Sequence, residues 1–545
     1  MDETTIFQAR NIITLDPRRP TASCVAVRGG RILGVGEMDE LAGWGPHRIE
    51  RRFADHVLAP GFVEGHAHMM TGALWTYVYV GHMDRADPKG RLWPALRDNA
   101  ALIQRLREAE AALPASEPLI GWGFDPLFID GPRLSKVELD QVSATRPILV
   151  LHSNLHLLTA NSAALALVGY DRSTTVHGVI KGEDGEPAGE LQEFGAIMPL
   201  FRRLKLDIEG VASGDRTMTA FAETARRAGV TTITDLGRTL RQEHVDELLA
   251  FTGREDCPVR IAPMLLSQFK GVDELIADAS AFAAQNTAKL RLGAIKIVVD
   301  GSIQGYTARV LWPGYYKGVD QGIWNVAPEQ LDAMVERLNA AGRQIHIHVN
   351  GDEACEAALD ALEKALASHP RPDHRHTLQH CQMASPAQYR RIKALGLCVN
   401  LFANHLYYFG DKHYELTLGP DRAERMNACG AATALGVPLA IHSDSPVTPL
   451  APLFTAWCAA NRITESGRVL GAGERIGVVD ALKAITLGPA FTLRMDHEIG
   501  SIETGKWADF AVLEADPLAG GPEGLKDVGV AGTVLAGRPM MEPMG

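Results

Sequence analysis

Short apolar runs recur along the central part of the chain, and stretches with helical spacing lie between them. Stretches such as Pro328–Ala341 and Asp352–Ser368 carry apolar residues at intervals typical of an amphipathic helix. The run Val57–Val63 and seven later apolar runs make eight strand-and-helix units. The later runs lie at residues 229–235, 259–264, 292–300, 344–350, 376–380, 397–404 and 437–444. This alternation predicts an α/β fold, a (β/α)8 TIM barrel with its active site at the carboxyl ends of the strands.

Both ends of the chain carry short runs typical of β-strands. Near the amino end they lie at residues 5–7, 11–15, 23–27 and 31–36, and near the carboxyl end at 500–513 and 528–535. Each set is too small to bury a core of its own. We therefore predict that residues 1–58 and 492–545 pair into one discontinuous small β-sandwich domain, and that the barrel domain occupies residues 59–491.

Residues 80–215 do not follow the alternation of the barrel. They contain a helix candidate at Pro94–Leu113, an aromatic cluster at residues 122–128 and an apolar run at residues 149–156. We predict that this segment is an insertion within the barrel domain, after its first strand.

The composition describes an ordinary soluble protein. Of 545 residues, 46% are hydrophobic and 22% are charged, which is enough apolar material for a sizeable core. The net charge of −12 argues against a nucleic-acid partner, and the absence of any run of ~18 apolar residues argues against a membrane span. The seven cysteines form no C-x-x-C pair, and the chain starts without a signal-peptide pattern. We therefore expect a cytoplasmic protein with reduced thiols.

Two histidines, His66 and His68, follow the first apolar run. If that run is a strand, side chains two positions apart, such as those of His66 and His68, point to the same side of it. Two neutral imidazoles at that place can bind one metal ion. Two unrelated surface or core histidines remain the alternative on this motif alone.

Three later strand ends carry further candidate ligands. Lys296 stands inside an apolar run, where an ammonium group is costly unless it is paired or neutralised. It either forms a salt bridge to Asp300 or another acid, or is carbamylated by CO2 to give an anion that can bridge two metals. His348 and His380 stand at the ends of the next two runs and are further candidate metal ligands.

Asp444 closes the last apolar run. A carboxylate at this position suits a metal ligand that also takes the proton from a metal-bound water. The alternative is a helix cap, a role that Ser443 or Ser445 would fill about as well. Taken together, two histidines after the first strand, a lysine, two more histidines and a final aspartate form a specific constellation.

On these motifs the chain resembles the amidohydrolase superfamily of metal-dependent hydrolases. Within it the chain is similar to the amidohydrolase-3 (YtcJ-like) group, which includes N-substituted formamide deformylases. The matching segments lie in the same order along the chain, at residues 59–68, 296–301, 348–354, 380–382, 442–447 and 500–509.

The resemblance implies a role for each ligand. His66 and His68 would bind the more buried metal, His348 and His380 the more exposed one, and Lys296 would bridge them as a carbamate. Asp444 would be both ligand and general base. Two positions depart from the pattern, since the group often has glycine where this chain has His442 and glutamate where it has Gln379. Either residue could alter the surroundings of the ligands. The exact substrate of a family member is therefore less readily assigned to this chain.

The predicted function is a metal-dependent hydrolase that cleaves a non-peptide C–N bond of amide, N-acyl or N-formyl type. Metal-bound hydroxide would attack, with Asp444 as general base and with Lys296 and His380 as the other catalytic residues. Zinc, one or two ions per chain, suits these ligands best, with Mn, Fe or Co as alternatives. An ester, lactone or cyclic imide hydrolase is a second hypothesis, and a non-catalytic regulator on the same fold is a third.

Substrate recognition must come from loops of the barrel and from the insertion. We predict that His405 and Tyr407, which follow the seventh strand, line the pocket. Trp75, Trp122 and His156 are further candidates for substrate binding. The expected partner is a small amide-type molecule, with no nucleic acid and no membrane, and a homodimer is expected from size and fold analogy.

Overall fold

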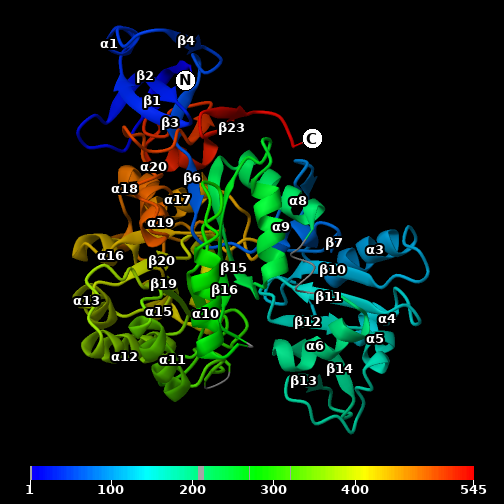
Figure 1. The fold of residues 1–545 in the computed structure, drawn as a ribbon. Coiled ribbons are helices and arrows are strands. Elements are labelled where there is room, and N and C mark those ends of the chain that lie inside the picture. The colour runs from blue at the N-terminus through cyan, green and yellow to red at the C-terminus, as the bar shows by residue number, and fades with distance from the viewer. Residues whose placement is uncertain (1–2, 130, 207–213, 269, 319–320, 545) are drawn as a thin grey trace. The chain divides into compact units, whose positions relative to one another are not determined.

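The computed structural model describes residues 3–129, 131–206, 214–268, 270–318 and 321–544 (Figure 1). The chain forms two compact units. The larger comprises Met1–His68 and Ala222–Gly545, and the smaller comprises Met69–Phe221. Among the described residues, no helix has both the length and the apolarity that crossing a membrane requires.

A curled sheet of eight parallel strands forms the centre of the larger unit. Its strand order is β21-β20-β19-β18-β17-β16-β15-β6. Beyond the two edge strands the backbone is joined, because Asp444 N donates to His66 O at 3.1 Å and His68 N donates to Ser445 O at 2.9 Å. The sheet therefore fits the predicted TIM barrel, and its strands are β6 (Phe62–Glu64), β15 (Val230–Arg238), β16 (Arg260–Leu266), β17 (Ile295–Val298), β18 (Ile345–Val349), β19 (Thr377–His380), β20 (Cys398–Leu401) and β21 (Leu439–Ile441).

Helices follow these strands along the chain, as the alternation predicts. Two of them, α11 (Pro328–Ala340) and α12 (Asp352–Ser368), lie within one residue of their predicted bounds and pack against β18. Ser385 shows how local sequence sets a boundary, because its side chain accepts from Gln388 N and caps the next helix. The other helices are α8 (Asp215–Arg227), α9 (Gln242–Thr252), α10 (Val272–Ala283), α13 (Pro386–Ala394), α14 (His405–Lys412), α15 (Pro420–Ala423), α16 (Cys429–Leu435), α17 (Pro452–Asn461), α18 (Val478–Ala484) and α19 (Leu487–Thr492).

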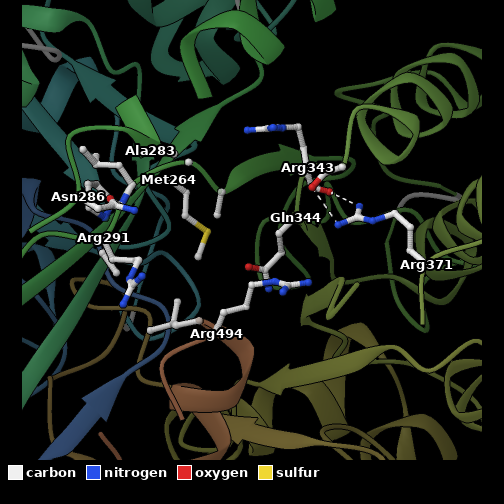
Figure 2. Close-up of a pocket in the computed structure, with 15 residues that line it drawn as sticks. Met264, Ala283, Asn286, Arg291, Arg343, Gln344, Arg371 and Arg494 are labelled. Carbon is white, nitrogen blue, oxygen red and sulfur yellow. Dashed lines mark hydrogen bonds between the residues drawn. The ribbon is translucent and has the colours of Figure 1, made fainter. Parts of the chain in front are cut away.

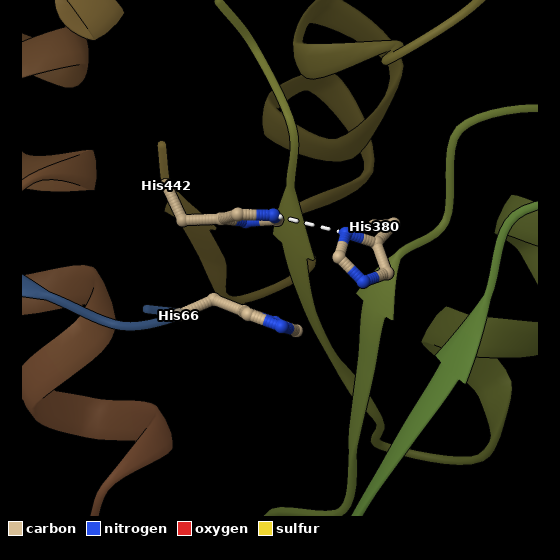
Figure 3. A group of neighbouring side chains, drawn as sticks. All are labelled: His66, His380 and His442. Carbon is tan, nitrogen blue, oxygen red and sulfur yellow. Dashed lines mark hydrogen bonds between the residues drawn. The ribbon is translucent and has the colours of Figure 1, made fainter. Parts of the chain in front are cut away.

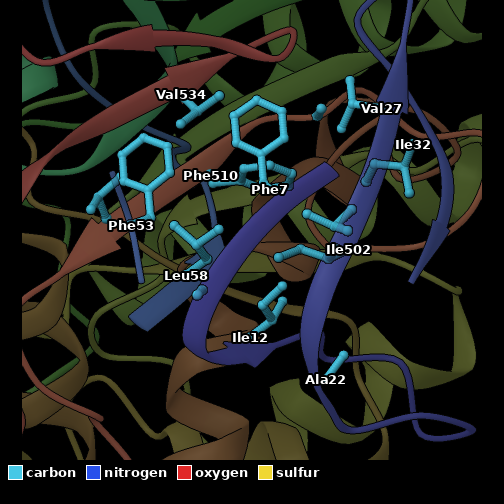
Figure 4. Packing of buried hydrophobic residues seen from close by; sticks show 14 residues of the cluster. Phe7, Ile12, Ala22, Val27, Ile32, Phe53, Leu58, Ile502, Phe510 and Val534 are labelled. Carbon is cyan, nitrogen blue, oxygen red and sulfur yellow. The ribbon is translucent and has the colours of Figure 1, made fainter. Parts of the chain in front are cut away.

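The two ends of the chain share a second eight-stranded sheet. Its order is β24-β23-β22-β5-β1-β2-β3, with β4 paired to β1, so the carboxyl-terminal strands join the amino-terminal ones where β22 pairs with β5. Phe7, Phe53 and Phe510 form its aromatic centre, packed with Leu58 and Val534 (Figure 4). A two-layered sandwich with the predicted limits stays a prediction. The strands are β1 (Thr4–Ile13), β2 (Thr21–Arg28), β3 (Arg31–Gly36), β4 (His47–Glu50), β5 (Val57–Pro60), β22 (Phe510–Leu513), β23 (Val530–Leu535) and β24 (Arg538–Met540).

The apolar run before His66 serves both sheets. The sequence predicts a single strand, but the structure divides the run at Gly61 into β5, which belongs to the terminal sheet, and β6, which belongs to the barrel. A Cβ atom on Gly61 would lie 2.1 Å from Thr231 Oγ1, so the close approach of β15 requires glycine here. The hydrophobic pattern gives no sign of the division, because both halves are buried.

The smaller unit contains a six-stranded sheet in the order β13-β14-β12-β11-β10-β7. The predicted insertion lies within this unit, and its residues 207–213 lie outside the described residues. The helix predicted from Pro94 begins only at Asn99, because Asp98 caps it by accepting from Ala101 N at 2.8 Å. The elements are β7 (Val78–Tyr79), β8 (Arg85–Ala86), β9 (Leu92–Trp93), β10 (Leu119–Phe124), β11 (Ile148–His152), β12 (Leu157–Ala160), β13 (Val179–Lys181) and β14 (Pro187–Gln192), with α2 (Met70–Leu74), α3 (Asn99–Glu110), α4 (Lys136–Asp140), α5 (Ser162–Leu167) and α6 (Glu193–Arg203).

Candidate metal centre

The six predicted metal ligands all belong to the larger unit and stand at or near the carboxyl ends of barrel strands. Parallel strands bring these ends to one edge of the sheet, so residues far apart in sequence come together. Most of the side chains are buried, with Lys296 and His66 each 1% exposed. The ligands and their strands are His66 and His68 after β6, Lys296 on β17, His348 on β18, His380 at the end of β19 and Asp444 after β21.

One set of ligand atoms has the spacing of a metal site. Asp444 Oδ1 lies 3.4 Å from His66 Nε2 and 3.0 Å from His68 Nε2. Lys296 Nζ lies 3.4 Å from His66 Nε2. Two ligand atoms at ~2.0–2.1 Å from a tetrahedral zinc ion are about 3.3 Å apart, so the observed separations fit a shared cation. His66, His68 and Asp444 thus form a donor set ready for a metal.

His380 joins this set to a second group of imidazoles. Its ring centroid lies 4.4 Å from that of His66 and 4.5 Å from that of His348. His380 Nδ1 lies 3.1 Å from His442 Nε2, and His66, His380 and His442 offer a further trio of neighbouring ligand atoms (Figure 3). His442 is a site residue whose contacts the sequence does not reveal.

The charges of the site favour a cation. Burial lowers the pKa of Lys296 to about 7 and lowers the pKa of His66 and of His380 well below the ordinary histidine value. Burial alone would raise the pKa of Asp444, but the hydrogen bond and charge of His68, with smaller effects of His442 and Lys296, bring it below its ordinary value. Neutral nitrogen donors around a carboxylate are the protonation states that metal ligation needs.

Two further residues that the sequence does not point to shape this site. Glu64 accepts from Ser443 N at 3.1 Å and from Ser443 Oγ at 3.0 Å, and so fixes the loop that carries Asp444. Burial raises the pKa of Glu64 to about 8. Gly237 gives His68 its room, since a Cβ there would lie 2.5 Å from Nδ1 of that ring. The only sequence signal for Glu64 is that a glutamate stands within an apolar run.

Two ligands stand on unusual backbone. His380 has φ of 65° and Asp444 has φ of 53°, a left-handed conformation that non-glycine residues seldom adopt. Such strain costs about 1–3 kcal/mol per residue and tends to cluster at functional sites. Asp444 is also no helix cap, because the next helix, α17, begins at Pro452 after Ala451.

The neighbours of Lys296 argue against its predicted salt bridge to Asp300, while a pairing with another acid and the carbamate both stay predictions. Its ammonium nitrogen lies beside His66, as described above. Asp300 instead accepts backbone N–H groups from Arg309, Asn350 and Gly351 at 2.9–3.0 Å. The geometry therefore associates Lys296 with the ligands and Asp300 with the loop backbone.

The predicted substrate-binding residues take different places. His405 is fully buried, accepts from Gln382 Nε2 at 2.8 Å and stacks on Phe409. Tyr407 is half-buried and meets Trp457 edge to face. Both stand in α14, directly after β20, and their role in substrate binding stays a prediction.

Trp75, Trp122 and His156 belong to the smaller unit. The two indoles pack at 90° with centroids 5.0 Å apart, and His156 Nδ1 lies 3.1 Å from Glu193 Oε2. Packing accounts for these contacts, and a role in substrate binding stays a prediction for them as well.

A cavity of about 320 Å³ lies at the opposite ends of the strands, among residues that precede β17 and β18 (Figure 2). Arg371 there donates to Arg343 O and Gly342 O, both at 2.9 Å. Arg291 binds Glu498 at 2.7 Å, and Arg494 binds Asp373. Each of these arginines thus has partners among the carbonyls and carboxylates of the chain itself.

Comparison with known proteins agrees with this geometry. Residues 54–541 match the model of the Amidohydrolase family. The chain is 26% identical to the putative amidohydrolase YtcJ of Bacillus subtilis (strain 168), over 98% of this chain and 99% of that protein. It is also 26% identical to the N-substituted formamide deformylase of Arthrobacter pascens, over 97% of this chain and 96% of that one.

A solved structure shows the same fold. A metal-dependent hydrolase of uncharacterized function from Pyrococcus horikoshii OT3 superposes with a TM-score of 0.71 at 18% identity, covering 95% of this chain and 98% of that one. The family match extends over nearly the whole chain, and the predicted resemblance is confirmed. This protein belongs to the amidohydrolase family.

Proposed function

We propose that this protein is a metal-dependent hydrolase that cleaves a non-peptide C–N bond of amide, N-acyl or N-formyl type. The observation that carries the proposal is the convergence of His66, His68, Lys296 and Asp444 at ligand spacing within the barrel. The name of the Arthrobacter pascens relative, an N-substituted formamide deformylase, supports this class of bond.

The donor set fits one or two divalent ions, most suitably zinc. His66, His68 and Asp444 would hold the first, and His348 and His380 the second. Lys296 would stand between them as a carbamate, in which its neutral amine forms an N–C bond to CO2 and releases one proton. A pKa of about 7 leaves much of this amine neutral and reactive at physiological pH. When bound, the metal supplies Lewis acidity that polarises a carbonyl and lowers the pKa of water.

Asp444 carries the proton through the reaction. Its carboxylate is 8% exposed and lies against His68, so it is charged and still open to the site. It accepts the proton of the attacking water and passes it to the nitrogen of the leaving amine, as the C–N bond breaks. His380, held at the end of β19, lies beside the position of the substrate's carbonyl group and helps to orient it.

A substrate panel tests the proposed bond class. N-formyl and N-acyl amines, simple esters, lactones and cyclic imides are offered to protein reconstituted with zinc and bicarbonate. We expect turnover of the amide group, reduced about 10²–10⁴-fold in Asp444→Asn. Turnover of esters, lactones or cyclic imides alone would transfer the assignment to that class, and no turnover with any substrate would contradict the proposal.

A further inference from the structure

His442 is held on both of its ring nitrogens. It is 1% exposed, and its Nδ1 lies 3.1 Å from Asn400 Oδ1 while its Nε2 lies 3.1 Å from His380 Nδ1. Its ring also stacks on His66 with centroids 4.8 Å apart and on Phe402 at 5.0 Å. The ring therefore has neither the space nor the free hydrogen-bonding capacity to turn.

Two amide side chains extend this contact to the other side of the site. Asn400 Nδ2 donates to Gln379 Oε1 at 2.9 Å, and His66 Nδ1 lies 2.7 Å from the same oxygen. Gln379 Nε2 in turn lies 2.8 Å from His346 Nδ1. A continuous relay thus runs from His66 through Gln379, Asn400 and His442 to His380.

The relay determines where the protons lie. An amide oxygen only accepts hydrogen bonds, so His66 must carry its proton on Nδ1, and so must His442. His442 Nε2 then holds a lone pair and accepts from Nδ1–H of His380. Both ends of the relay, His66 and His380, are left with a lone pair on Nε2.

The opposite orientation of the two amides would reverse every donor and acceptor. Nε2 of His66 and Nε2 of His380 would then both carry protons, and neither could bind a metal through that atom. The tautomers of His66 and His380 are therefore coupled. One orientation of the amides leaves a lone pair on Nε2 of both rings, and the other leaves none. Gln379 and His442, the two departures from the family pattern, are both members of this relay.

We propose that His442 is a positioning residue that holds His380 with its proton on Nδ1, and that the relay through Asn400 and Gln379 ties this tautomer to that of His66. The consequence for metal affinity rests on the proposed metal centre, whereas the tautomers exist in the metal-free protein. Partners of this kind typically contribute 10–100-fold to metal affinity.

The first experiment reads the tautomers without metal. Metal-free protein labelled with ¹⁵N at histidine is compared by NMR as wild type, His442→Gly and His442→Gln, and the His380 signal is assigned by its loss in His380→Gln. We expect the Nδ1–H form of His380 in wild type and in His442→Gln, whose side-chain oxygen can accept the same proton. In His442→Gly we expect a shift toward Nε2–H. An unchanged His380 tautomer in the glycine variant would overturn the proposal.

The second experiment measures zinc affinity against a competing chelator. We expect His442→Gly to weaken one ion about 10–100-fold and His442→Gln to recover most of that loss. The control is His376→Gln, which alters another buried histidine on the same chain, bonded to Asn339 rather than to the relay. Thermal melts of all variants verify folding.

The outcomes separate the two proposals. Wild-type protein that binds no zinc contradicts the proposed function, while the NMR result still decides the role of His442. Equal zinc affinity in wild type and His442→Gly overturns the positioning role. Equal losses in the glycine and glutamine variants, with an altered spectrum of the cobalt form, would make His442 a ligand itself and overturn it too.

Discussion

The two ends of the barrel use nitrogen-rich side chains in opposite ways. At the carboxyl ends of the strands, the side chains of His66, His68 and Asp444 turn their polar atoms toward one another at the spacing of metal ligands. At the amino ends, Arg371 and Arg291 donate to carbonyls and carboxylates of the chain itself. The amino end pairs its arginines with the chain itself, whereas the carboxyl end gathers candidate ligands, which agrees with the usual division of TIM barrels into a catalytic and a stabilising face.

The contrast separates residues that stabilise the fold from candidates for function. Satisfied hydrogen bonds stabilise the fold, whereas the left-handed backbone at His380 and Asp444 costs stability. Such cost is tolerated at a site that a ligand will stabilise. Substitutions at the two ends should therefore separate activity from stability.

The largest effect is expected at the catalytic end. Asp444→Asn removes the proton acceptor, so kcat should fall about 10²–10⁴-fold on the best amide of the panel. The melting temperature of the metal-free protein should also fall, because the fold stabilises the Asp444 carboxylate through His68 and asparagine lacks that charge. A variant that lost stability and kept its activity would reverse the proposed comparison.

The loss of folding stability at low pH should also arise at the end of the barrel that carries the buried histidines. Burial lowers the pKa of His413, in the π-helix His413–Thr417 after α14, to about 3. The folded state then stays neutral while the unfolded state gains a proton below pH 6.5, so stability present above pH 6.5 is lost as the pH falls toward 3. The slope is about 1.4 kcal/mol per pH unit, or about 5 kcal/mol in all.

The variant His413→Gln should flatten this part of the curve of unfolding free energy against pH, measured by urea titration. Arg371→Gln serves as the matched control, since guanidinium does not titrate in this range and the slope should stay as in wild type. Identical slopes in wild type and His413→Gln would show that this histidine is not neutral in the fold.

A smaller loss of stability, without loss of activity, is expected at the amino ends. Arg371→Gln leaves the carbonyls of Gly342 and Arg343 without their donor, which should cost about 1–3 kcal/mol in chemical unfolding. The activity per folded molecule should be unchanged. A large fall in kcat would mean that this end takes part in the reaction.

The smallest effect is expected for Arg494→Gln in the same cavity. Its guanidinium pairs with Asp373, and the two side chains are 39% and 61% exposed, so solvent weakens the pair. The free energy of unfolding should change by less than about 1 kcal/mol. A loss as large as that of Arg371→Gln would show that the arginines act as one network.

Much of the barrel could be predicted from the sequence because each strand is a buried apolar run. The six candidate ligands could be picked out because a metal needs histidine, carboxylate or neutralised lysine, and such residues are conspicuous at the ends of apolar strands; that they bind a metal stays a prediction. The division at Gly61 and the later start of the helix at Asn99 depend on contacts with Thr231 and on capping by Asp98, which the hydrophobic pattern does not encode.

The relay could not be predicted from the sequence, for a related reason. Gln379 and His442 could be recognised as departures from the family pattern, but their connection depends on Asn400, an asparagine with no distinguishing sequence context. Glu64 and Gly237 likewise take their meaning from loops that lie beside them only in the folded barrel. Residues that bind a ligand leave a local signature, whereas residues that orient them do not.

The metal content of wild type and of Lys296→Ala, measured by elemental analysis after supply of zinc and bicarbonate, tests the proposed metal centre most directly. We predict about two ions per wild-type chain and one or none in the variant. One ion in both would contradict the bridging role of Lys296. No metal in either protein would contradict the hydrolase assignment itself.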